Sequence, residues 1–142
     1  MAVCDKEVDD WKEAVRIAIN PLVNRGDVNE KYVDDVIANI TEFGPYVCIV
    51  PRICIPHAMS KNNVTESNIA FVKFNKPVNF ENADNKGEQF ISTLFFPIAA
   101  CDPDEHLKNL TMLMEALDNP ELIDKLCEAS SMEELNTIID NL

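Results

Sequence analysis

The segment of residues 46–59, YVCIVPRICIPHAM, constrains the fold more than any other part of the chain. Its first half is rich in β-branched and aromatic residues, which favour a buried, pleated strand. A Pro-Arg dipeptide interrupts the run, and three further apolar residues lead to Pro56 and His57. Because Pro56 has no N–H to donate to a sheet, the strand must end or reach an edge there. His57 is therefore predicted where a buried strand gives way to a loop, with a fixed backbone and a ring open to a partner.

Two amphipathic helices are predicted before this segment, because apolar residues recur there with helical spacing. Asp10 and Asn29 are suited to cap their first turns, and Gly44 follows the last turn of the second helix. Pro21 is expected to bend the last turn of the first helix or to end that helix early.

Further strands are predicted after His57. Residues 68–74 alternate apolar and polar side chains, Lys76-Pro77 is expected to turn the chain, and residues 78–80 suit a short strand. Residues 89–100 form the most apolar stretch and suit a central strand, in which pairing ends or bulges at Pro97.

The last third of the chain is predicted to be helical. Asp102 can cap a helix that begins with Pro103, and a second helix opens at Asn119-Pro120. Ser131 with Glu134 forms a capping box for a final helix over residues 132–142. With no repeat or linker in view, we expect residues 1–142 to form one α/β domain. Its single central mixed β-sheet is expected to carry helices on both faces, since its strands are apolar throughout.

The charge of the chain limits its partners. It has 25 acidic against 12 basic residues and a net charge of -13, which disfavours nucleic acid and favours a basic protein partner. No apolar run approaches the roughly 20 residues that a bilayer helix needs, so we expect a cytoplasmic protein without direct membrane insertion. The five cysteines are odd in number and form no CxxC pair, which indicates buried, reduced thiols.

The candidate chemistry rests on the two histidines of the chain, His57 and His106. The three glycines are too far apart to form a phosphate-binding loop, and no Ser/His/Asp motif is present. If the strands that precede His57 and His106 are neighbours in the sheet, both imidazoles emerge at the same end of it. His106 is predicted in the first turn of a helix, where free N–H groups attract anions and the dipole favours a neutral ring. This arrangement suits a phosphoryl group on His57, with His106 beside it.

A zinc site is the alternative that the residue types leave open. Cys54 with His57, and Cys101 with His106, would supply two thiolates and two imidazoles. Strand alternation argues against it, because it directs Cys54 and His57 to opposite faces unless the chain turns at Pro56.

Several motifs together resemble a known family. The sequence ICIPHA at residues 53–58 resembles the Pro-His motif of enzyme IIA components of the sugar phosphotransferase system, in the mannitol-fructose superfamily. The sequence DEHL at residues 104–107, followed by leucines with helical spacing, resembles that family's second histidine on its helix. The sequences DWKEA at residues 10–14 and GPY at residues 44–46 are most similar to the ascorbate-type subgroup.

The resemblance implies a phosphocarrier that needs no cofactor or metal. His57 would accept a phosphoryl group from the carrier HPr and pass it to a cysteine of a IIB component, while His106 would stabilise the phosphoryl oxygens. A membrane IIC component would then move the sugar. The same domain could instead serve as a phosphorylatable regulator that is not coupled to transport.

Two residues depart from the subgroup that the chain resembles. Arg52 stands where that subgroup usually has glycine, and Met59 stands where it usually has arginine. The second change removes a cation beside the expected phosphohistidine, and Arg52 and Lys61 are the candidates to replace its charge.

Overall fold

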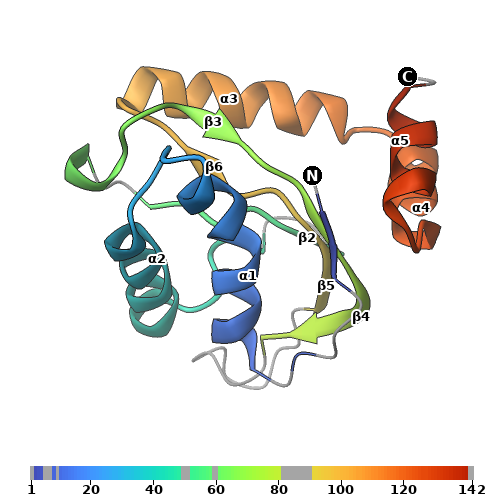
Figure 1. The fold of residues 1–142 in the computed structure, drawn as a ribbon, viewed down its shortest axis with the longest axis horizontal. Helices are drawn as coiled ribbons and strands as arrows, with labels where there is room; N and C mark the ends of the chain where they lie inside the picture. Colours follow the sequence, from blue (N-terminus) through green and yellow to red (C-terminus); the bar gives the residue numbers. More distant parts are fainter. Residues whose placement is uncertain are drawn as a thin grey trace.

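The computed structural model describes residues 2–4, 8, 10–48, 52–58, 61–80 and 91–140. Helices dominate the two ends of this part of the chain, and the strands lie between them, apart from one at the N-terminus (Figure 1). The elements are, in chain order, β1 (Ala2–Cys4), α1 (Trp11–Asn24), α2 (Glu30–Phe43), β2 (Arg52–Cys54), the 3-10 helix η1 (Lys61–Asn63), β3 (Asn68–Ile69), β4 (Val72–Asn79), β5 (Ile91–Phe95), β6 (Ile98–Ala99), α3 (Pro103–Ala116), α4 (Pro120–Glu128) and α5 (Met132–Asp140).

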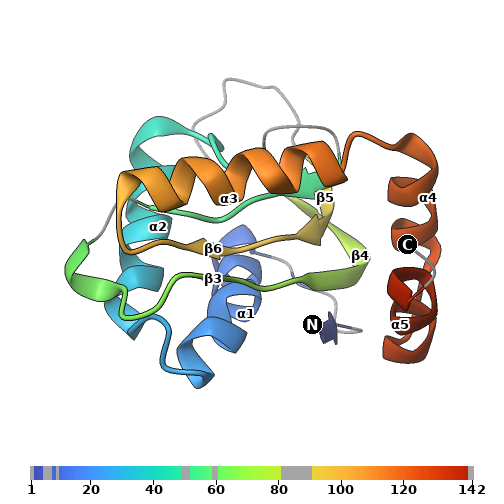
Figure 2. The same ribbon diagram turned by 90° about the horizontal axis from the view of Figure 1, so that it is seen from above.

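The strands form a mixed sheet with the order β1-β4-β5-β2. The outer strands β1 and β2 run parallel to their neighbours, and the central pair β4 and β5 is antiparallel. A short antiparallel ribbon, β3 with β6, extends from this central pair, since the N–H of Ala70 donates to the carbonyl of Pro97 at 3.0 Å. The ribbon carries the chain from the sheet to the start of α3 (Figure 2).

Helices cover both faces of the sheet, which confirms the predicted α/β class. Side chains alternate along β2 and β5, so that Cys54 and Phe95 face the core that contains α1 and α2. Ile53 and Leu94 face the opposite core, which is closed by α3, α4 and α5. In Figures 1 and 2, α1 and α2 lie on one side of the strands and α3 on the other.

The predicted caps of the first two helices are confirmed. The side chain of Asp10 accepts from the N–H of Lys12 at 3.0 Å, and that of Asn29 accepts from the N–H of Tyr32 at 3.1 Å. Pro21 does not end α1 early, because the helix continues to Asn24. A proline so close to a helix end removes a single intrahelical hydrogen bond, which the packing of α1 against the sheet outweighs.

The caps of the C-terminal helices are confirmed as well. Asp102 accepts from the N–H of Glu105 at 2.8 Å. Ser131 accepts from the N–H of Glu134 at 3.2 Å, and the Glu134 carboxylate accepts from the N–H of Ser130 at 2.6 Å. The predicted end of the last helix, residues 141–142, lies outside the described residues.

The strand expected over residues 46–55 is shorter in the structure. Tyr46 lies in a turn, where its N–H donates to the carbonyl of Gly44 at 2.7 Å and the N–H of Cys48 donates to that of Pro45 at 3.0 Å. The Gly-Pro turn therefore outweighs the strand propensity of the residues that follow it. Strand β2 covers only Arg52–Cys54, and residues 49–51 lie outside the described residues.

The prediction of a turn at Lys76-Pro77 is wrong, because β4 continues through these residues to Asn79. The pairing of β4 with β5 shifts register between Lys73 and Val78, so the proline falls in an irregular stretch where it needs to donate no ladder hydrogen bond. The apolar stretch over residues 91–100 is divided into β5 and β6 at Phe96 and Pro97, as the proline indicated.

Candidate functional site

Hydrogen bonds to both of its chain neighbours hold His57 in place. The carbonyl of Pro56 accepts from the N–H of Ile98 at 3.0 Å. On the other side, the N–H of Ala58 donates to the hydroxyl oxygen of Tyr32 at 3.2 Å, and that hydroxyl donates to the carbonyl of Ile98 at 2.6 Å. The loop that leaves β2 is therefore tied to α2 and to β6, and the backbone beneath the imidazole is fixed.

The ring of His57 is oriented by its own backbone. Its Nδ1 lies 2.6 Å from the carbonyl oxygen of Ile55, and a carbonyl oxygen can only accept a hydrogen bond. Nδ1 therefore carries the proton in the neutral ring, and Nε2 carries the free electron pair. The sequence could not predict this tautomer, because it depends on how the chain turns at Pro56.

Tyr46 packs against the same ring. The two rings meet edge to face, with centroids 5.2 Å apart and an interplanar angle of 85°. The Tyr46 hydroxyl also donates to the carbonyl of His57, so one side chain restrains both the ring and the backbone. The sequence predicts Tyr46 in a strand, and it gives no role to Tyr32 beyond its place in the second predicted helix. The clue to both roles is that a buried tyrosine hydroxyl usually needs a polar partner.

The structure brings His57 and His106 together. Their ring centroids are 5.0 Å apart and the rings are tilted by 40°. The pairing follows from the topology: β2 and β5 are parallel neighbours, so the segments that leave them emerge at the same end of the sheet. His106 lies in the first turn of α3, where its N–H donates to the carbonyl of Asp102 at 3.1 Å.

Both imidazoles are held toward the neutral form. Burial lowers the pKa of His57, and the neighbouring His106 lowers it further, while the hydrogen bond with the Ile55 carbonyl partly opposes the shift. Burial also lowers the pKa of His106. Burial raises the pKa of Tyr32 and of Tyr46 to about 12, so both hydroxyls keep their protons at neutral pH.

The acidic residues around His106 have partners in the helix cap. Asp102 accepts from the N–H of Glu105 at 2.8 Å, and the Glu105 carboxylate accepts from the hydroxyl of Ser67. The Ser67 oxygen in turn accepts from the N–H of Cys101 at 2.9 Å. Two of the carboxylates next to His106 in the sequence therefore serve to fix the start of α3.

The four candidate zinc ligands are not assembled. Cys54 is fully buried in the core that contains α1 and α2, where its free thiol forms a hydrogen bond with that of Cys48. Cys101 is exposed, contrary to the buried thiol expected, and its Sγ lies 3.6 Å from the carbonyl oxygen of Thr65. Among the residues that the structure describes, no group of three or more potential metal ligands gathers.

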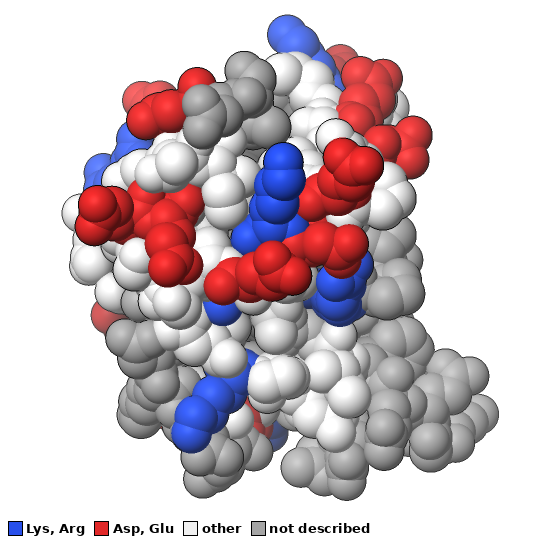
Figure 3. Space-filling view, turned by 90° about the vertical axis from the view of Figure 1, so that its right-hand side faces the viewer, with Lys and Arg blue, Asp and Glu red and all other residues white. Residues whose placement is uncertain are grey.

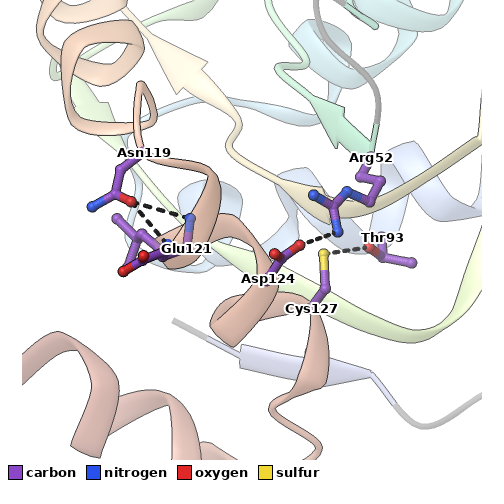
Figure 4. A network of polar contacts seen from close by, with 7 residues as sticks. Arg52, Thr93, Asn119, Glu121, Asp124 and Cys127 are labelled. Atoms are coloured by element: carbon purple, nitrogen blue, oxygen red, sulfur yellow. Dashed lines mark hydrogen bonds and ion pairs between the residues drawn. The ribbon is translucent and has the colours of Figure 1, made fainter.

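Arg52 does not reach His57. Its guanidinium lies at the other end of β2, where Nη1 is 2.8 Å from the Asp124 carboxylate on α4 (Figure 4). Its φ of 72° falls in the left-handed region, which a glycine adopts without a steric penalty. Met59 and the side chain of Lys61, the other candidate to replace the missing charge, lie outside the described residues.

Solved structures of enzyme IIA proteins are similar to this chain. The crystal structure of IIA mannitol from Escherichia coli is 25% identical, with a TM-score of 0.78 over 97% of this chain and 94% of that chain. The complex of enzyme IIAMtl with phosphorylated enzyme IIBMtl from Escherichia coli gives the same identity and TM-score over 99% of this chain and 94% of that chain. The fold is therefore that of enzyme IIA proteins.

Sequence comparison gives the family. The model of the phosphoenolpyruvate-dependent sugar phosphotransferase system, EIIA 2, matches residues 1–142. The ascorbate-specific EIIA component of Escherichia coli (strain K12) is 27% identical over 135 residues, which are 94% of this chain and 85% of that protein. The chain belongs to this enzyme IIA family of the sugar phosphotransferase system. Within the described part of the chain, none of the helices has the length and apolar character needed to cross a membrane.

Proposed function

We propose that this protein is a cytoplasmic phosphocarrier that accepts a phosphoryl group on Nε2 of His57 from phospho-HPr and passes it to a cysteine of a IIB component. The observation that carries the proposal is the 2.6 Å contact between Nδ1 of His57 and the carbonyl of Ile55. It leaves the electron pair of Nε2 available to attack phosphorus, and it holds the ring in a single orientation.

The first transfer needs little more than position and charge. As Nε2 forms its bond to phosphorus, the N–P bond of the donor breaks and the donor imidazole takes up the released electron pair. The ring of His57 gains positive charge in this step, and the Ile55 carbonyl at Nδ1 stabilises it. In the second transfer a thiolate of IIB attacks the same phosphorus, and the Nε2–P bond breaks.

His106 is proposed to stabilise the phosphoryl oxygens. Its ring is 5.0 Å from that of His57 and its pKa is lowered, so a neutral ring can donate one N–H to the transferring group. The positive end of the α3 dipole adds a favourable field for an anion at this place.

The proposed partners follow from the relatives and from charge. A relative of known structure was solved in complex with a phosphorylated IIB protein, which supports IIB as the acceptor here. A net charge of -13 favours docking by a carrier with basic side chains around its own histidine, as expected for HPr. A membrane IIC component would take part only indirectly, after IIB.

Reconstituted labelling tests the proposal. The protein is incubated with enzyme I, HPr and phosphoenolpyruvate, and its intact mass should rise by about 80 Da in an acid-labile form. His57→Ala should abolish the adduct while the far-ultraviolet circular dichroism stays unchanged. An adduct of equal yield on His57→Ala would place the acceptor elsewhere.

A further inference from the structure

A groove opens at the end of α3 that lies away from His106. It has a volume of about 730 Å³ and lies between the last turns of α3, the start of α4 and Arg52 of β2. We define the α3–α4 groove by an apolar floor and an acidic rim, formed by Leu110, Met114, Leu117 and Ile123 and by Glu115 and Asp118. In Figure 2, α3 lies along the sheet, and α4 and α5 stand beyond its C-terminal end.

The floor of the groove is apolar surface that the fold leaves partly uncovered. No residue of α3 is fully buried, whereas α1 and α2 each bury a full apolar stripe. Leu110, Met114 and Ile123 are half-buried against the second core. The chain turns sharply at Asn119, which caps α4 by accepting from the N–H groups of Glu121 and Leu122 at 3.1 and 3.3 Å (Figure 4).

The rim of the groove is negatively charged. Arg52 is its one cation among the described lining residues, and Asp124 neutralises it at 2.8 Å. Glu115 and Asp118 are exposed, and they take no part in the ion pairs Arg25–Asp27 and Arg52–Asp124. The C-terminus of α3 adds partial negative charge, and its last turn contains no basic residue. Acidic side chains, with basic ones among them, also gather over the neighbouring face of the molecule (Figure 3).

These features select one kind of occupant. We propose that the α3–α4 groove docks a segment of a partner protein that offers apolar side chains to the floor and Lys or Arg to Glu115 and Asp118, separately from docking at His57. A second copy of this chain would bring another net charge of -13 to an acidic rim, which like-charge repulsion opposes. Glu115 lies nine residues beyond His106, about 14 Å along the axis of α3, so the two surfaces are distinct.

Peptide titration followed by NMR tests this docking surface. The ¹⁵N-labelled protein is titrated with a synthetic amphipathic helix of Leu and Lys, and separately with a matched helix of Leu and Glu. The Leu/Lys peptide should produce saturable shifts centred on the amides of Met114, Asp118 and Ile123, and the Leu/Glu peptide should not. Shifts centred on His57 and His106, or scattered over the surface, would overturn the proposal. Groove shifts that grow with protein concentration alone would show that a second copy is the occupant.

Two charge-reversal variants separate the effect of the groove on peptide binding from the effect of the overall charge of the protein. Glu115 and Glu42 are both exposed and both lie in the last turn of a 14-residue helix, but only Glu115 lines the groove. Glu115→Lys should lower the affinity for the Leu/Lys peptide by about tenfold, and Glu42→Lys should lower it by less than about twofold. An equal loss of affinity in the two variants would mean that peptide binding depends only on the net charge of the protein.

The same variants show whether the groove belongs to the phosphoryl site. Glu115→Lys should accept phosphate from phospho-HPr at the rate of the unaltered protein. A slower rate, with an unchanged ¹⁵N spectrum outside the groove, would place the groove within the footprint of the donor and contradict a separate docking surface.

Discussion

The ring of His106 lies 5.0 Å from the ring of His57, and the two imidazoles come from segments almost fifty residues apart in the sequence. Parallel pairing of β2 with β5 is what joins them, because it brings the exits of both strands to one end of the sheet. Each ring is held toward its neutral form by burial. A neutral pair is suited to one nucleophile and one hydrogen-bond donor, which are the roles proposed for His57 and His106.

The role of His106 predicts a rate effect without loss of the acceptor. His106→Ala removes the proposed donor to the phosphoryl oxygens and should slow phosphoryl transfer from phospho-HPr by about a hundredfold, while prolonged incubation still gives the full adduct. Asn109→Ala, one turn further along α3, is the control and should leave the rate unchanged. Quench-flow labelling measures both rates. An unaltered rate in His106→Ala would remove this residue from the mechanism.

The hydroxyl of Tyr32 predicts a stability effect. Tyr32→Phe leaves the carbonyl of Ile98 and the N–H of Ala58 without the partner they share, at a fully buried position. The free energy of unfolding should fall by about 2 kcal/mol. Tyr46→Phe, which removes the hydrogen bonds to the His57 carbonyl and to the Asn39 side chain, should cost less because Tyr46 is only half-buried. Urea unfolding gives both values, and the reverse order would contradict the bridging role of Tyr32.

The lowered pKa values predict how stability depends on pH. In the unfolded chain the histidines titrate near 6.5, and in the folded protein His57 and His106 titrate below that value. The folded state then binds fewer protons than the unfolded state. The contribution of the two histidines to the free energy of unfolding is therefore fully present above pH 6.5, and it is lost as the pH falls through the folded pKa values.

Denaturant unfolding between pH 7.5 and about pH 5 checks this dependence. The double variant His57→Gln with His106→Gln should show a smaller fall in the free energy of unfolding over the same range. An equal fall would assign the acid sensitivity to other groups.

The backbone of Arg52 predicts an unusual order of substitutions. At a φ of 72° a side chain with a Cβ is strained, so Arg52→Gly should be more stable than Arg52→Ala by about 1 kcal/mol. Both variants lose the ion pair with Asp124, so the difference in stability between them reports the backbone strain alone. Thermal unfolding measures it. If Arg52→Ala were the more stable, the left-handed conformation would not be the source of strain.

Local patterns predicted much of this fold, because caps and helical spacing are read over a few residues. Asp10, Asn29, Asp102 and the Ser131 box mark the starts of helices where the structure has them. Strand limits were less predictable, since pairing decides them. The strand β1 has only three residues, too few to show the alternation of side chains that predicts a strand. It forms because it pairs with β4.

The candidate site was predicted only as far as its two histidines. Their proximity depends on parallel pairing between β2 and β5, which the sequence could state only as a condition. The tautomer of His57 depends on a carbonyl two residues back, and the roles of Tyr32 and Tyr46 depend on contacts across the fold. No short motif in the sequence records such contacts.

The position of the phosphorus on the ring tests the central claim most directly. The protein is labelled through enzyme I and HPr, and the long-range ¹H–³¹P couplings of the phosphohistidine are measured and assigned by peptide mapping. Because Nδ1 of His57 is engaged by the Ile55 carbonyl, the account predicts phosphorus on Nε2 of His57. Phosphorus on Nδ1 of His57, or on His106, would contradict it.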